Sequence, residues 1–258
     1  MRLMKRILSA AAVLALSASL LVGCSSGTAS SVPVSASSAA ESTVSSVEET
    51  ASSAVDENEA AAAQLLNDLT GSYQELWPVI LADEYKQTWL DDCTALVGED
   101  NAEAAFEKLS SMVTGDVYGE DAVKAYANGG GAYFCGFTNS LATLTFDGET
   151  STISGTDKDG NVLFSHAYHY IGMEPVRGLY EFESDDADSG EFTYFFLAPD
   201  TSVETYHIEF RYGSDAEALS QYDAGEYAYW LASGISTDYD QTMIENCIKL
   251  FCTENLSA

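Results

Sequence analysis

Three histidines and one glutamate are the residues of this chain best suited to hold a metal ion. They are His166, His169, His207 and Glu209, and imidazole and carboxylate groups both bind zinc. On an extended strand, side chains two positions apart share a face, so His207 and Glu209 would point the same way. His166 and His169 are three positions apart and would point to opposite faces, so a bulge would be needed for both to join one centre. We therefore predict a metal site of His207, one of His166 or His169, and Glu209 or another acid. The alternative is three ordinary hydrogen-bonded histidines.

Four other residues with possible chemistry are cysteines that could form disulfides. They are Cys93, Cys135, Cys247 and Cys252, and an even number of cysteines in an exported chain permits bridges. If Cys247 and Cys252 share one helix, their Cα atoms lie about 8 Å apart, beyond disulfide reach. Two double pairings remain, 93–247 with 135–252 or 93–252 with 135–247, and a single bridge is the third possibility.

Composition excludes several classes of function. The chain has 10 Lys and Arg against 41 Asp and Glu, a formal net charge of −31. Nucleic-acid binding depends on neutralising phosphates with basic side chains, so we expect no nucleic-acid partner. The sequence contains no G-x-S-x-G, H-E-x-x-H, P-loop or dinucleotide-binding motif, and we expect a binding protein, not an enzyme.

The first 58 residues predict export and anchoring. Arg2, Lys5 and Arg6 precede an apolar run that closes with Leu-Val-Gly-Cys at residues 21–24. This is the pattern of a secretory signal, and its end resembles a bacterial lipobox. We predict a lipoprotein signal peptide over 1–23, acyl chains on Cys24, and attachment to the extracytoplasmic side of the cell membrane through them. Residues 24–58 are rich in Ser and Ala, lack aromatic residues, and are predicted to form a disordered tether.

Residues 59–258 hold every aromatic residue of the chain and predict one α+β domain. Apolar spacing indicates helices over 59–76, about 79–96 and from Asp100 onward. From Ala132 the period changes to two, and turn signals recur about every ten residues, which predicts six or so short strands in a small antiparallel barrel. A final helix follows, which Asp238 or Asp240 could cap.

Four landmarks along this domain resemble the ZinT-type zinc-binding domain family. They are LTGSYQELWP at 69–78, RGLYEFE at 177–183, LAP followed by TYHI within 197–208, and Trp230 before the terminal helix. They are similar to the family's W-x-G-x-W-Q-x-x-x-P, G-V-R-Y-L-F-E and I-A-P…H-F-H-I segments and to its C-terminal end. The resemblance spans roughly residues 65–252. It implies a calycin-like antiparallel β-barrel with N-terminal helices and a C-terminal helix, and a role in capturing zinc outside the cytoplasm.

The chain departs from this family at the zinc ligands. The family binds zinc through three histidines, whose positions here carry Phe195, Thr205 and His207. Neither Phe nor an ordinary Thr supplies a zinc ligand. We predict a lipid-anchored protein that binds a divalent metal ion, zinc first, and that could serve a zinc transporter. The alternative is a metal-free module for a small ligand or a protein partner on the same barrel.

Overall fold

The computed structural model describes residues 57–114, 133–199 and 207–256. The predicted signal peptide (1–23), Cys24, the tether up to residue 56 and Thr205 lie outside the described residues. Within the described ranges, no helix is both long enough and apolar enough to span a bilayer.

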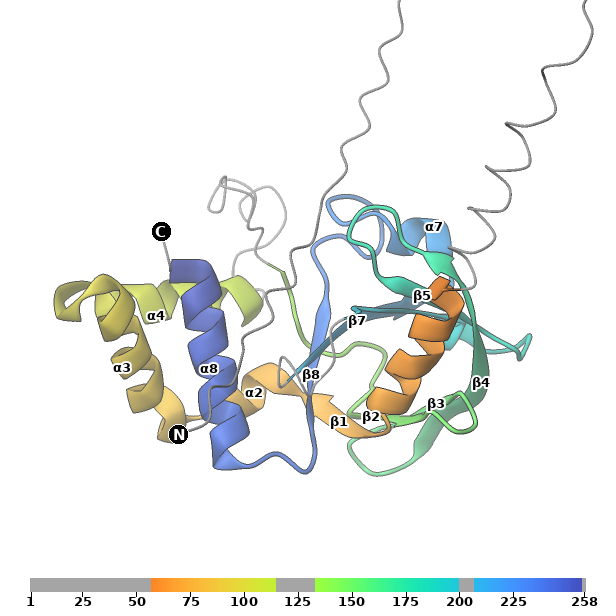
Figure 1. Ribbon diagram of the computed structural model, residues 1–258, viewed down its shortest axis with the longest axis horizontal. Coiled ribbons are helices and arrows are strands. Elements are labelled where there is room, and N and C mark those ends of the chain that lie inside the picture. The colour runs from red at the N-terminus through yellow and green to blue at the C-terminus, as the bar shows by residue number, and fades with distance from the viewer. Residues whose placement is uncertain (1–56, 115–132, 200–206, 257–258) are drawn as a thin grey trace, which may run out of the picture. The chain divides into compact units, whose positions relative to one another are not determined.

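Eight strands of the described chain form a closed antiparallel barrel (Figure 1). Each strand pairs with the next in sequence, and β8 pairs with β1 to close the ring. The strands are β1 (Gly71–Glu75), β2 (Thr143–Asp147), β3 (Thr152–Thr156), β4 (Val162–Met173), β5 (Tyr180–Ser184), β6 (Tyr194–Leu197), β7 (Ile208–Gly213) and β8 (Ala232–Ser236). With helices before β2 and a helix at the C-terminal end, this confirms the α+β class and is consistent with a calycin-like fold.

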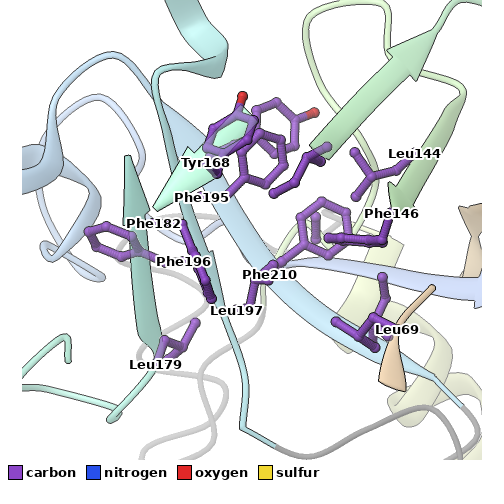
Figure 2. Close-up of a cluster of buried hydrophobic side chains, with 14 of the residues drawn as sticks. Leu69, Leu144, Phe146, Tyr168, Leu179, Phe182, Phe195, Phe196, Leu197 and Phe210 are labelled. Carbon is purple, nitrogen blue, oxygen red and sulfur yellow. The ribbon is translucent and has the colours of Figure 1, made fainter. Parts of the chain in front are cut away.

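Large apolar side chains fill the barrel interior (Figure 2). Side chains alternate across each strand, so one of every two residues points inward. Phe195, Phe210 and Tyr212 are fully buried, and the ring of Phe195 stacks 5.4 Å from Tyr212 and 6.5 Å from Phe210. Each such side chain contributes about 2–3 kcal/mol of burial free energy. The interior is thus a packed core.

The two strands that close the barrel differ from the sequence prediction. The predicted helix over 59–76 ends at residue 68, and β1 follows it. β8, with the sequence ASGIS, was not among the predicted strands. Both strands pair with a neighbour on each side, so tertiary pairing overrides weak local preference. Packing explains the glycine at position 234, because a Cβ there would lie 3.1 Å from Cγ1 of Ile208.

A helical layer with its own core covers one part of the barrel's outside (Figure 1). Short α2 (Leu76–Ile80) and the 3₁₀ turn η1 (Asp83–Tyr85) lead into α3 (Lys86–Val97) and α4 (Glu99–Thr114). They pack with the C-terminal helix α8 around the fully buried Trp89. The helix over 57–68 instead packs against the barrel core through Leu65 and Leu66. A one-turn helix, α7 (Ala216–Leu219), follows β7.

The C-terminal helix α8 (Gln241–Leu256) follows β8 and packs in the helical layer, mainly against α3. Its buried stripe is Ile244, Cys247, Ile248 and Cys252. The carboxylate of Asp240 accepts a hydrogen bond from Met243 N at 2.9 Å. Asp240 is therefore the cap, one of the two residues predicted for that role.

Candidate functional site

A pocket of about 290 Å³ lies between the outer wall of the barrel and the helical layer. Its barrel side comes from the start of β7, the segment before β8, and residues 133–135. Its helical side comes from α2, the end of α4 and α8. The lining residues are Leu76, Trp77, Ile80, Met112, Val113, Tyr133, Cys135, Arg177, His207, Glu209, Leu231, Cys247, Leu250, Phe251, Glu254 and Asn255. An apolar pocket with a few polar groups is the usual form of a small-ligand site.

The structure brings His207 and Glu209 together on this pocket wall. His207 Nε2 lies 3.9 Å from Glu209 Oε1, and their side chains are 18% and 41% exposed. Both face outward because the residue between them, Ile208, points into the barrel core. The pair is sheltered yet reachable, which suits a bound cation.

Arg211 continues the same outward face of β7, but it does not reach the pocket lining. Its side chain is fully buried, and its guanidinium donates hydrogen bonds to the carbonyls of Leu219 and Tyr227. The guanidinium also stacks 4.3 Å from the ring centre of Tyr222. Burial lowers the pKa of Arg211, and the interactions with carbonyls and ring offset part of the cost of burying the charge. Arg211 therefore fastens the 219–227 segment to β7.

The other two predicted ligands, His166 and His169, lie on β4 and do not line the pocket. His166 Nδ1 is 2.7 Å from Asp186 Oδ2, and His169 Nδ1 is 2.7 Å from Asp185 Oδ1. The two histidines thus have separate carboxylate partners. The structure does not bring either one to His207, because β5 and β6 separate β4 from β7 in the barrel.

Cys135 and Arg177 are two of the pocket residues that were not predicted as part of this site. Cys135 is buried, and its backbone carbonyl accepts a hydrogen bond from Ser233 N on β8 at 3.0 Å. Burial raises the pKa of the Cys135 thiol to about 12, and the nearby charge of Glu209 acts in the same direction. The thiol is therefore protonated at neutral pH. Sequence reasoning treated Cys135 only as a disulfide candidate.

Arg177 is the second of these residues, and it supplies a positive charge to the pocket. Its guanidinium lies 5.0 Å from the ring centre of Tyr133 and 4.7 Å from that of Tyr222, and Nη2 donates to the Tyr133 hydroxyl at 3.0 Å. Cation–π contact on two rings restricts an otherwise flexible side chain. Arg177 is one of only 10 basic residues in an acidic chain. That rarity is the sequence signal that could have singled it out.

The described residues fit a zinc ion only in part. Adjacent ligands of a tetrahedral zinc ion, each about 2.0–2.1 Å from the metal, lie roughly 3.4 Å apart. The 3.9 Å between His207 and Glu209 needs a shift of about half an ångström. Over residues 57–114, 133–199 and 207–256, however, no three His, Cys, Asp or Glu side chains converge as a metal cluster. His207 and Glu209 are two donor groups, whereas structural zinc sites use four ligands.

The cysteines predicted as disulfide candidates lie in two places. Cys93 on α3 and Cys252 on α8 are fully buried, with their Sγ atoms 3.9 Å apart. Cys135 and Cys247 line the pocket, and burial raises the pKa of the Cys247 thiol to about 12. Cys247 and Cys252 both belong to α8, as the sequence analysis assumed.

Fold and site together define a closed antiparallel β-barrel with a sheltered, partly charged pocket against its outer wall. Two solved structures are similar to it. The Zn(II)-bound ZinT-like domain of Streptococcus pneumoniae AdcA has 16% identity and a TM-score of 0.46, over 71% of this chain and 89% of that one. Zn(II)-bound AdcA of the same organism has 16% identity and a TM-score of 0.41, over 75% of this chain and 35% of that one. No family model and no curated protein matches the chain.

Proposed function

We propose that this protein binds a divalent metal ion, preferably zinc, outside the cytoplasm. His207 and Glu209 are the protein ligands of this ion. The observation that carries the proposal is the 3.9 Å separation of His207 Nε2 and Glu209 Oε1 on the wall of a pocket. An imidazole and a carboxylate at this spacing can share one ion after a small side-chain movement. The pocket leaves room for water at the remaining positions. Two protein ligands would make binding weaker than at a three-histidine site, which suits a protein that passes its ion on.

Zinc titration of the full chain, purified without an affinity tag, tests this proposal. A competing chromophoric chelator reports the affinity. We expect one ion per chain, and a loss of at least about tenfold in affinity for both His207→Ala and Glu209→Gln. His169→Ala is the matched control, because His169 is paired with Asp185 outside the pocket. Equal affinities in the unaltered chain and His207→Ala would refute the assignment.

A small organic ligand is the second candidate, and the apolar side of the pocket favours it. Leu76, Trp77, Leu250 and Phe251 line the same space as Arg177. At about 290 Å³ the space is just below the range of ligand pockets, which runs from roughly 300 to 1,000 Å³. Native mass spectrometry of the freshly purified chain distinguishes the two, since a retained organic mass in place of zinc would favour this candidate.

The proposal includes anchoring of the mature chain to the cell membrane through Cys24, with a zinc transporter as the receiving partner and no catalytic step. The support is the charged and apolar pattern that ends at Cys24. Cell fractionation tests the anchor. The unaltered chain should sediment with membranes, and Cys24→Ala should lose its fatty-acid label. Label retained in that variant would rule out Cys24 as the acylated residue.

A further inference from the structure

Helices α3 and α8 place two cysteines from opposite ends of the domain in contact. Cys93 and Cys252 are separated by 159 positions in sequence, yet their Sγ atoms are 3.9 Å apart. Both side chains are fully buried in the core of the helical layer. A disulfide has an S–S distance of about 2.05 Å, so the sulfurs need to approach by roughly 2 Å. Rotation about the Cα–Cβ bonds moves each sulfur by a distance of that order.

We propose that Cys93 and Cys252 form a disulfide bond that fastens α8 to α3. The two thiols lose two electrons and two protons, and an external disulfide, such as oxidised glutathione or a thiol–disulfide oxidoreductase, accepts them and becomes two thiols. The S–S bond of the oxidant breaks as the new one forms, by exchange through a mixed disulfide. This bond belongs to one of the two double pairings that the sequence left open, 93–252 with 135–247.

Cys247 does not compete for this bond in the folded protein. It lies on α8 five residues before Cys252, but it lines the pocket, whereas neither Cys93 nor Cys252 does. α8 therefore offers two cysteines, of which one meets Cys93. This gives the experiment a control on the same helix.

The bond has to form while the domain folds. Both thiols are fully buried, and burial raises the pKa of each, so a folded chain presents neither access nor thiolate to an oxidant. The predicted export to an oxidising compartment would supply the disulfide oxidant. Once formed, the bond would hold the helix that provides one wall of the pocket.

Refolding of the full chain tests the proposal. The denatured, reduced chain is refolded in a glutathione redox buffer with a chelator present, then alkylated under denaturing, non-reducing conditions and digested. We expect mass spectrometry to find the peptides of Cys93 and Cys252 linked, and the melting temperature to be roughly 5–10 °C above that of the chain refolded with dithiothreitol. Cys247→Ser should keep the linked peptide and Cys252→Ser should lose it. Alkylated Cys93 and Cys252 in the refolded unaltered chain, or a link from Cys93 to Cys247, would overturn the assignment, and this readout needs no variant to fold.

Discussion

The hydroxyl of Tyr212 is a single group whose removal should destabilise the barrel measurably. It donates a hydrogen bond to the Thr138 carbonyl at 2.9 Å and accepts from Thr138 N at 2.7 Å and Thr138 Oγ1 at 3.1 Å. Tyr212→Phe keeps the ring, which is fully buried and packs 4.9 Å from Trp230. The variant would leave the backbone donor and acceptor of Thr138 without this partner. Each such loss costs about 1–3 kcal/mol, and Thr138 is only partly buried, so we expect about 2 kcal/mol.

Urea unfolding followed by tryptophan fluorescence measures this loss. About 2 kcal/mol corresponds to a fall in melting temperature of roughly 4–8 °C for a domain of this size, with an unchanged denaturant m-value. Tyr194→Phe is the matched control, because that hydroxyl makes a hydrogen bond of 3.1 Å to Glu183 at a half-buried position. It should cost under about 1 kcal/mol. Tyr212→Phe within about 0.5 kcal/mol of the unaltered chain would refute the reasoning that Tyr212 anchors Thr138.

Three further predictions concern pH, packing and capping. Burial raises the pKa of Tyr212 to about 12 from about 10 in the unfolded chain. The contribution of this hydroxyl to stability is therefore complete below pH 10 and is lost as the pH rises toward 12. Tyr212→Phe should flatten this loss of stability in urea titrations at alkaline pH. Gly234→Ala should destabilise the fold by about 1–3 kcal/mol, because its new Cβ would lie 3.1 Å from Ile208 on β7. Gly172→Ala is the control and should cost under about 1 kcal/mol, because the nearest atom is 3.8 Å away. Equal melting temperatures of the two variants would contradict this prediction. Asp240→Ala should lower the free energy of unfolding by about 1 kcal/mol through loss of the α8 cap, and Asp238→Ala should not, as calorimetry of both would show.

The sequence predicts the middle of the barrel better than its closure. Strands such as β2 (TLTFD), β5 (YEFES) and β7 (IEFRYG) alternate apolar and polar residues, so the local pattern is sufficient to predict them. β1 follows a helix whose apolar spacing runs on through Tyr73, and β8 is made largely of small residues. Both exist because each lies between two other strands, which is information that no local window contains.

The candidate site, like the barrel, could be predicted from the sequence only in part. Period-two alternation is enough to predict that His207 and Glu209 share a face, and the structure places both on one pocket wall. The predicted third ligand, His166 or His169, depended on the spatial order of strands, and the closed ring places β4 three strands away from β7. Cys135 and Arg177 come to the pocket through the packing of separate segments against the helical layer, which residue spacing does not encode.

The pairing of β1 with β8 has a consequence for how the chain is made. Tyr73 lies opposite Ser236, so the seam joins the first of the eight described strands to the last one in the sequence. Until the last strand is present, the chain carries two bare strand edges, which are templates for aggregation. Any product that stops short of residue 236 would keep both edges open for good, so chaperones and proteases would meet an unsealed sheet in every prematurely terminated copy.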